Sequence, residues 1–171
     1  MRTLIVIDMQ NDFVTGSLAN KAAADIIPFI KAEIESGNYS RILFTQDTHY
    51  KEYLETQEGK NLPIVHCEFG TDGWQIVDDL KRYAINGSCA HKETFGYLGW
   101  ANPKWGLYDV DEIVLVGTCT DICVVSNALL IKALYPEKKL SVLAKGCAGL
   151  TPEKHAAALE VMKSCQINVI D

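Results

Sequence analysis

Cys123 lies in the run 117–125, where a cysteine could act as a nucleophile. This run follows the apolar segment 112–116 and begins a helical pattern of apolar residues, so we expect a turn between a strand and a helix. The partial positive charge at a helix N-terminus favours a thiolate over a thiol. The sequence therefore predicts a cysteine nucleophile with a lowered pKa.

Two further residues have the chemistry that such a nucleophile needs. Asp8, at the end of the apolar run 3–8, can accept the thiol proton, and the Lys92 ammonium can stabilise both anions. The backbone amides of Cys119 and Cys123 are the predicted donors to an oxyanion. Each residue taken alone is more often structural, as a turn cap, a solvated charge or a core thiol. Their combination favours catalysis.

A second group of polar residues has the chemistry of metal ligands. Asp47 and His49 are two positions apart in an expected extended loop, so their side chains point to the same side. With the more distant His66, and with Glu58 as a candidate fourth ligand, they form a predicted nitrogen and oxygen site for a divalent ion such as zinc. The alternative is that all are solvated loop residues. Cys119 and Cys123, four apart, give only a weak pattern for a metal or redox pair.

Short β-branched runs alternate with longer helical patterns along the chain. Strands are expected at residues 3–8, 41–46, 89–91, 112–117, 140–144 and 167–170, and helices at 22–36, 74–83, 121–134 and from residue 152 onward. This order predicts an α/β fold: a doubly wound three-layer sandwich with a mainly parallel sheet of about six strands. Ligands bind at the carboxyl ends of such strands, where Asp8, Asp47, Lys92 and Cys123 all fall. His91 and His155 are predicted to be structural.

The composition is that of a globular protein, with 171 residues of which 48% are hydrophobic and 22% charged. We expect one domain over residues 1–171. A net charge of -6 without a basic cluster argues against a nucleic-acid partner. No apolar run is long enough for a membrane span or a signal peptide, and six cysteines without such a signal are typical of reduced thiols. These features predict a cytoplasmic protein.

The motifs around these residues resemble those of the isochorismatase-like cysteine hydrolase family, and most of all its nicotinamidase-related amidases. The matching segments are Asp8-x-Gln10-x-Asp12-Phe13, Gly117-x-x-Thr120-Asp121-x-Cys123-Val124, Lys92, and the tail Cys147-Ala148…His155…Ala158-Leu159. The resemblance therefore covers nearly the whole chain. It implies an isochorismatase-like α/β fold with Rossmann-type topology and a triad of Cys123, Asp8 and Lys92.

The resemblance also implies how a substrate would be held. The oxyanion would bind the amides of Cys119 and Cys123, helped by a cis peptide bond between Thr118 and Cys119. Asp47, His49 and His66 would hold a metal that binds the ring nitrogen of the substrate, with Glu58 as a fourth ligand if one extra residue is allowed before His66. Phe13 would form an aromatic wall, Phe95 and Thr118 would be further substrate contacts, and Phe95, Tyr97 and Trp100 are lid candidates. Relatives are commonly dimers or larger, so a homo-oligomer is expected.

The chain departs from the nicotinamidase pattern at three points. A tryptophan is usual just before the second metal histidine, but residues 62–65 are Leu-Pro-Ile-Val. Asn127 stands where threonine is usual, and the chain is short. Cys123 itself argues against isochorismate, because relatives that cleave that vinyl ether lack the cysteine.

The main hypothesis is a metal-assisted cysteine amidase for a small carboxamide, with nicotinamide as the first candidate. A second hypothesis is an amidase for another small amide, such as a carbamoyl or ureido compound. A third, from a different class, is a non-catalytic thiol sensor or ligand-binding module in which Cys119 and Cys123 form a reversible disulfide.

Overall fold

A computed structural model describes residues 1–85 and 87–171. Within these residues, six parallel strands form one sheet in the order β3-β2-β1-β4-β5-β6. The strands are β1 (Arg2–Ile7), β2 (Arg41–Asp47), β3 (Cys89–Lys92), β4 (Glu112–Thr118), β5 (Lys139–Ala148) and β6 (Asn168–Ile170). This is the strand order of a doubly wound sheet, in which the direction of winding reverses between β1 and β4. The predicted fold class is confirmed.

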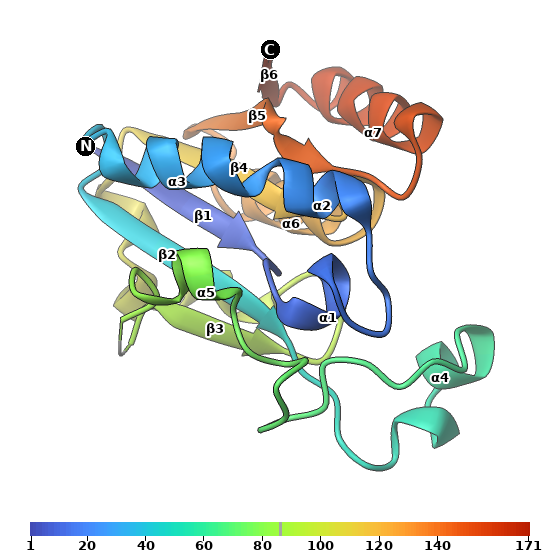
Figure 1. Cartoon of the computed structure of the whole chain (residues 1–171). Coiled ribbons are helices and arrows are strands. Elements are labelled where there is room, and N and C mark those ends of the chain that lie inside the picture. Colours follow the sequence, from blue (N-terminus) through green and yellow to red (C-terminus); the bar gives the residue numbers. More distant parts are fainter. Residues whose placement is uncertain (86) are drawn as a thin grey trace.

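Helices cover both faces of the sheet (Figure 1). They are α1 (Asn11–Val14), α2 (Lys21–Asp25), α3 (Ile27–Glu35), α4 (Gln57–Asn61), α5 (Asp78–Lys81), α6 (Val125–Leu134) and α7 (Pro152–Ser164). Single turns are η1 (Tyr53–Glu55), η2 (Leu98–Ala101), η3 (Pro103–Trp105), η4 (Leu107–Asp109) and the π-helical turn η5 (Thr120–Val124). The segment with η1 and α4 lies beyond the carboxyl ends of β2 and β3 (Figure 1).

The central strands are apolar because both of their faces are buried. Leu4 and Val6 of β1 pack into the core under α2 and α3, whereas Ile5 and Ile7 pack into the core under α6 and α7. Successive side chains of a strand point to opposite faces, so a continuous apolar run supplies both cores. All four side chains are completely buried. The two cores hold the carboxyl ends of the strands in fixed positions.

The helix expected over residues 22–36 is two helices, α2 and α3, with Ile26 between them. Pro28 explains the break, since it has no N–H to donate to the carbonyl of Ala24, and its ring would collide with that carbonyl in a continuous helix. Pro28 is instead placed in the first turn of α3, where an N–H is not needed. The prediction of a single helix is therefore wrong.

The helix expected over residues 74–83 is reduced to the four residues of α5. Before α5 the chain passes through a turn at Trp74, and Ile76 then forms an antiparallel bridge with Gln10 in the segment after β1. Asn11 donates its N–H to the carbonyl of Gln75 at 2.9 Å, and Val77 donates to the carbonyl of Met9 at 3.0 Å. The apolar pattern of this stretch thus reflects core packing rather than a helix, and the prediction is wrong for residues 74–77.

The strand expected over residues 140–144 is longer, because β5 continues to Ala148. Its pairing with β4 shifts register between Leu115 and Gly117, which brings Cys147 and Ala148 beside the end of β4. In the part of the chain that is described, no helix has the length and apolar character that crossing a membrane requires.

Candidate active site and metal centre

The candidate catalytic residues meet where the winding of the sheet reverses. Asp8 follows β1, Cys123 lies in η5 just after β4, and Lys92 ends β3. The chain turns sharply at Asp8, which has a φ of 49°. Aspartate is one of the few residues other than glycine that tolerates this left-handed region. Because of this conformation, the Asp8 side chain no longer follows the alternating pattern of β1. It lies at the edge of the sheet where ligands bind.

The three side chains lie in contact and are almost fully buried. The Lys92 Nζ atom is 2.7 Å from Asp8 Oδ2 and 3.6 Å from Cys123 Sγ. The hydroxyl of Thr45 donates to Asp8 Oδ1 at 2.6 Å, which fixes the carboxylate from its other side. One ammonium group therefore bridges the thiol and the carboxylate.

Burial and charge set the protonation of this group. Burial raises the pKa of Asp8, and the charge of Asp47 adds to this, although Lys92 opposes it. Burial works against the charged form of Lys92, but the anions around it raise its pKa well above the ordinary value. Burial also raises the pKa of the Cys123 thiol, and Lys92 opposes this only in part. Burial outweighs the Lys92 ammonium in this structure, so the pKa of the thiol is shifted upward, opposite to the direction expected from the helix N-terminus.

The turn that carries the nucleophile has the backbone expected from the family resemblance. The peptide bond between Thr118 and Cys119 is cis, which confirms that prediction. Cys119 is extended and precedes η5, whose π-helical turn contains Cys123. Thr118 lies away from the cavity wall, and its hydroxyl donates to the carbonyl of Ala148 at 3.1 Å. The structure thus does not bring Thr118 to the predicted substrate position.

The predicted metal ligands form one cluster beside the triad. Asp47, His49, Glu58 and His66 each offer a ligand atom, and these atoms lie within 4.8 Å of one another. His49 Nε2 is 3.0 Å from Asp47 Oδ2 and 3.6 Å from Glu58 Oε1, whereas His66 Nε2 is 3.5 and 3.8 Å from the same two oxygens. Around a tetrahedral zinc ion with bonds of about 2.0–2.2 Å, neighbouring ligand atoms are about 3.3–3.6 Å apart. The cluster fits such an ion.

Other contacts orient these ligands. His66 Nδ1 is 2.8 Å from the carbonyl of Ile64, an interaction that leaves Nε2 with its lone pair toward the cluster. Although burial favours the neutral acid, the charge of the Lys92 ammonium lowers the pKa of Asp47. Lys92 Nζ contacts Asp47 Oδ1 at 3.0 Å, while Oδ2 faces the histidines. The Asp47 carboxylate therefore belongs to both the triad and the metal cluster.

Gln10 and Asp12, both in the first motif, form hydrogen bonds with the backbone of the loops that carry the candidate metal ligands. The sequence alone did not predict this role. The side-chain amide of Gln10 pairs with the backbone of Asp47, donating to its carbonyl at 2.9 Å and accepting from its N–H at 2.7 Å. Asp12 Oδ2 accepts the N–H of Cys67, next to His66, at 2.7 Å. The signal for this role in the sequence was the position of the two residues, two and four places after Asp8. The targets of their side chains, however, are set by the tertiary fold.

A cavity of about 180 Å³ opens onto both groups. Its wall consists of Phe13, Leu18, Asp47, Glu58, Leu62, His66, Phe95, Cys119, Ile122, Cys123 and Leu150. The predicted contacts Phe13 and Phe95 are therefore both in place, and the ring of Phe13 lies 5.7 Å from that of His66. Drug-sized pockets are about 300–1,000 Å³, so this cavity suits a smaller, flat and mainly apolar ligand. A wider outer hollow of about 540 Å³ shares Glu58, Leu62, Phe95 and Ile122 with it.

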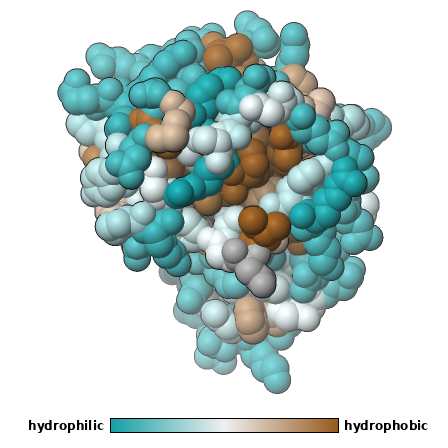
Figure 2. Space-filling view, turned by 90° about the vertical axis from the view of Figure 1, so that its left-hand side faces the viewer, coloured by the Kyte–Doolittle hydropathy of each residue, from teal (hydrophilic) through white to brown (hydrophobic). Residues whose placement is uncertain are grey.

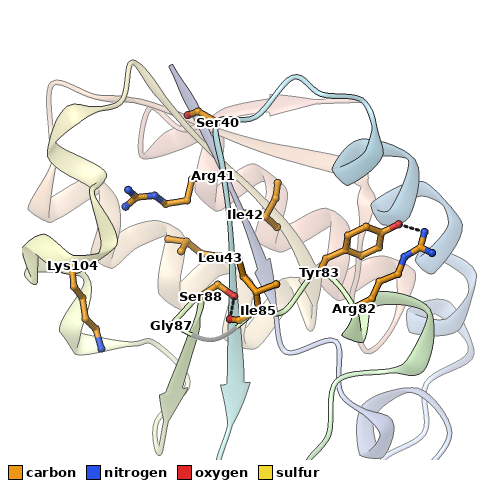
Figure 3. A pocket seen from close by; sticks show the side chains of 10 residues that line it. All are labelled: Ser40, Arg41, Ile42, Leu43, Arg82, Tyr83, Ile85, Gly87, Ser88 and Lys104. Carbon is orange, nitrogen blue, oxygen red and sulfur yellow. Dashed lines mark hydrogen bonds between the residues drawn. The ribbon is translucent and has the colours of Figure 1, made fainter.

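Another hollow, of about 480 Å³, lies at the opposite end of the sheet, near the start of β2. Hydrophobic residues gather near the centre of this face and hydrophilic ones surround them (Figure 2). Arg41, Arg82 and Lys104 line the hollow (Figure 3). Each has a partner: Arg41 donates to the carbonyl of Trp105, Arg82 pairs with Glu35 at 2.6 Å, and Lys104 lies 4.3 Å above the ring of Trp105. This hollow is remote from the candidate catalytic group.

A doubly wound parallel sheet with an Asp–Lys–Cys group at its reversal point and a histidine–carboxylate cluster beside it defines the class of protein. The chain belongs to the isochorismatase domain family, whose model matches residues 2–171. It is 29% identical to a nicotinamidase/pyrazinamidase of Mycobacterium tuberculosis, over 99% of this chain and 98% of the relative. It is 27% identical to a nicotinamidase of Saccharomyces cerevisiae, over the full length of both.

Among solved structures, the chain resembles a pyrazinamidase of Pyrococcus horikoshii in complex with zinc. The TM-score is 0.79 at 28% identity, and the match covers 99% of this chain and 98% of the other. A nicotinamidase of Bacillus subtilis gives a TM-score of 0.76 at 26% identity, over 99% of both chains. The fold therefore matches these structures over nearly the whole chain.

Proposed function

We propose that this protein is a metal-assisted cysteine amidase that hydrolyses nicotinamide to nicotinate and ammonia. The observation that carries the proposal is the position of Lys92 Nζ, 2.7 Å from Asp8 and 3.6 Å from Cys123, beside a cluster of four metal-type ligands. Both groups open onto one small cavity with aromatic walls. The nicotinamidase relatives support the same activity.

In the first half of the reaction the thiol becomes a nucleophile. The S–H proton of Cys123 passes to Asp8, and the sulfur attacks the amide carbon. The Lys92 ammonium offsets the negative charge throughout, and the amides of Cys119 and Cys123 bind the oxyanion. Asp8 then gives its proton to the departing nitrogen, so that ammonia leaves and a thioester remains. The raised pKa of Asp8 suits a group that must hold and return this proton.

In the second half, water replaces ammonia. Asp8 accepts a proton from the water as its oxygen attacks the thioester carbon. When the carbon–sulfur bond breaks, the proton returns to Cys123 and the carboxylic acid product is released. Each step moves protons only between groups that lie in direct contact with the nucleophile or the substrate.

Asp47, His49, Glu58 and His66 would hold a divalent ion, and zinc is favoured by the nitrogen and oxygen donors and by the zinc-bound relative. A bound ion would supply a Lewis-acidic position for the ring nitrogen of the substrate and so orient the amide. Phe13, which lies against His66, would pack on the ring.

Ammonia release from nicotinamide tests the proposal. Cys123→Ala should abolish turnover while leaving the thermal midpoint close to that of the unaltered protein, because alanine fills most of the buried thiol site. The matched control is Cys165→Ala, which alters an exposed cysteine and should keep full activity. Turnover that survives in Cys123→Ala would rule out covalent catalysis by this residue.

Treatment with a chelator tests the metal. Activity on nicotinamide should disappear with EDTA and return when zinc or another divalent ion is added, because the ion orients the ring. A panel of primary amides assayed in parallel distinguishes the hypotheses. If turnover is insensitive to EDTA and fastest with a carbamoyl or ureido compound, the second hypothesis replaces nicotinamide. No turnover with any amide would favour the thiol sensor.

A further inference from the structure

Asn127 is a completely buried polar residue, one helical turn after Cys123 on α6. Its Nδ2 group donates to the carbonyl of Cys123 at 2.8 Å and to the carbonyl of Phe95 at 3.2 Å. Its Oδ1 atom accepts from the N–H of Tyr97 at 3.0 Å and from Nε1 of Trp100 at 2.8 Å. A side-chain amide offers two N–H groups and two lone pairs, so all of its hydrogen-bonding capacity is used.

These four bonds join two separate parts of the active site. One part is the turn that carries the nucleophile, held through the Cys123 carbonyl. The other is the segment 95–100, which begins with Phe95 on the wall of the substrate cavity. The segment also lies close against α6, since a Cβ atom on Gly96 would overlap the side chain of Leu130. Just before the segment, the Thr94 hydroxyl donates to the carbonyl of Gly96 at 2.7 Å.

We propose that Asn127 is a positioning residue that fixes the Phe95 wall relative to the Cys123 sulfur and thereby sets the preference for flat aromatic amides. The inference rests on the proposed amidase function and deepens it. Asn127 does not line the cavity, so it acts through Phe95 and through the backbone of Cys123. An aromatic wall stabilises the substrate and the transition state alike, so its displacement raises KM more than it lowers kcat.

Asparagine is the residue type that this junction requires. Aspartate keeps the acceptor for Tyr97 and Trp100 but places an oxygen against the carbonyls of Phe95 and Cys123. Serine and threonine have only one donor, and an apolar residue leaves all four partners unpaired in a buried site. Asn127→Asp therefore separates the donor bonds, which hold the wall and the nucleophile, from the acceptor bonds, which hold the rest of the segment.

The test compares a ring amide with an amide that lacks a ring. In Asn127→Asp, kcat/KM for nicotinamide should fall on the order of ten-fold, mainly through KM, as expected for the loss of buried hydrogen bonds. For propionamide, which cannot pack on Phe95, the fall should be less than about two-fold. Phe95→Ala should change the ratio of kcat/KM for nicotinamide to kcat/KM for propionamide in the same direction. The double variant should lose little more than either single variant, because both changes remove the same wall.

Two further measurements separate positioning from a general loss of stability. Asn102→Ala removes the cap of η3 near the same segment without touching Cys123, so it should lower the thermal midpoint while leaving the ratio between the two amides unchanged. Hydrogen exchange at the Tyr97 amide should be faster in Asn127→Ala, which lacks the acceptor, than in Asn127→Asp.

The inference is overturned if Asn127→Asp leaves the ratio unchanged, or if Asn102→Ala shifts it equally. It is also overturned if the effects of Asn127→Asp and Phe95→Ala simply add. Failure of the amidase proposal has a different signature, because the unaltered protein would then release no ammonia from either amide. In that case the proposed preference for aromatic amides is refuted together with the amidase function. Hydrogen exchange at the Tyr97 amide alone then decides whether Asn127 holds the segment 95–100.

Discussion

Asp8 combines two demands that few residue types meet, a left-handed backbone conformation and a carboxylate that can hold a proton. Asparagine tolerates the same backbone region and has nearly the same shape, but it cannot accept the thiol proton. The amide oxygen of an asparagine at this position could also keep the hydrogen bond from Thr45. The amide nitrogen would then face the Lys92 ammonium, so the exchange removes the proton acceptor and the buried ion pair together.

Asp8→Asn should lower kcat for nicotinamide by about 10²–10⁴-fold, the usual contribution of general acid–base catalysis. The thermal midpoint should also fall, because the buried Lys92 ammonium loses one anionic partner, whereas the stoichiometry of bound metal should stay close to that of the unaltered protein. Steady-state ammonia release and thermal unfolding measure the two effects. Retention of more than a tenth of the activity would show that another group takes the proton.

Gln10 pairs with the backbone of Asp47, so we expect it to support the proposed metal site without being a ligand itself. Gln10→Ala should weaken metal binding about 10–100-fold, as is typical when a partner of a ligand is removed. Competition with a chromophoric chelator measures this independently of turnover. The matched control is Gln46→Ala, because the Gln46 side chain donates to the carbonyl of Trp74 at 3.0 Å, as Gln10 also does, but does not pair with the Asp47 backbone as Gln10 does. Equal losses of affinity in both variants would contradict the role of Gln10.

Residue types at strand ends were sufficient to predict that Asp8, Asp47, Lys92 and Cys123 meet at the site, whereas Glu58 and His66 lie in the long connection between β2 and β3. Two features could not be predicted in this way. The direction of the cysteine pKa depends on how deeply the thiol is buried, which no local pattern reveals. The partners of Asn127 come from a loop about thirty residues away, so only the folded chain shows them.

At the scale of elements, β1 and β4 must approach closely to bring Asp8 beside the nucleophile turn. Ile7 pairs with Gly117, which has a φ of 123°, and a Cβ at this glycine would overlap the carbonyl oxygen of Ile7. Backbone atoms cannot move aside as a flexible side chain does. The glycine is therefore needed for the contact as well as for its conformation.

Gly117→Ala should destabilise the fold by more than about 3 kcal/mol, since strain in the backbone adds to a steric overlap in the core. Gly37→Ala is the matched control: Gly37 also has a positive φ, of 73°, but a Cβ there would meet no atom within 4 Å. Gly37→Ala should lower the free energy of unfolding by only about 1 kcal/mol. Denaturant unfolding of the two variants measures the difference. Similar losses of stability would show that conformation alone, without the close approach, explains Gly117.

The strands were easier to predict than the helices for a physical reason. A continuous apolar run of four residues, as in β1 and β4, fits a strand buried on both faces and is too short for a typical helix. Apolar residues at helical spacing in the stretch 74–83 instead pack an extended segment against the core, and the backbone partners of that segment lie more than sixty residues away. The break at Ile26 could have been predicted from Pro28, whereas this pairing could not.

At the scale of the whole molecule, the acidic character predicted from the net charge of -6 extends to the entrance of the site. Glu52, Glu58 and Glu93 line the outer hollow, and none of the described residues that line it is lysine or arginine. Walls of one charge repel ions of the same sign over about a Debye length. Neutral amides are therefore admitted more readily than anions.

Nicotinate, an anion, should consequently be a weak competitive inhibitor at low salt. Its inhibition constant should fall several-fold as ionic strength rises from about 0.01 to 0.15 M, whereas KM for neutral nicotinamide should change little. Glu93→Gln, which removes one exposed charge, should reduce this salt dependence. Initial rates at several salt concentrations measure all three effects. An inhibition constant that does not respond to salt would refute electrostatic exclusion.

The single carboxylate of Asp47 touches the ammonium of the triad with one oxygen and the histidines with the other. Stripping the ion would thus redirect negative charge toward Lys92 and, through it, toward the sulfur. If the cluster binds a divalent ion as proposed, the identity of that ion would tune the reactivity of the thiol from a distance, without altering any amino acid.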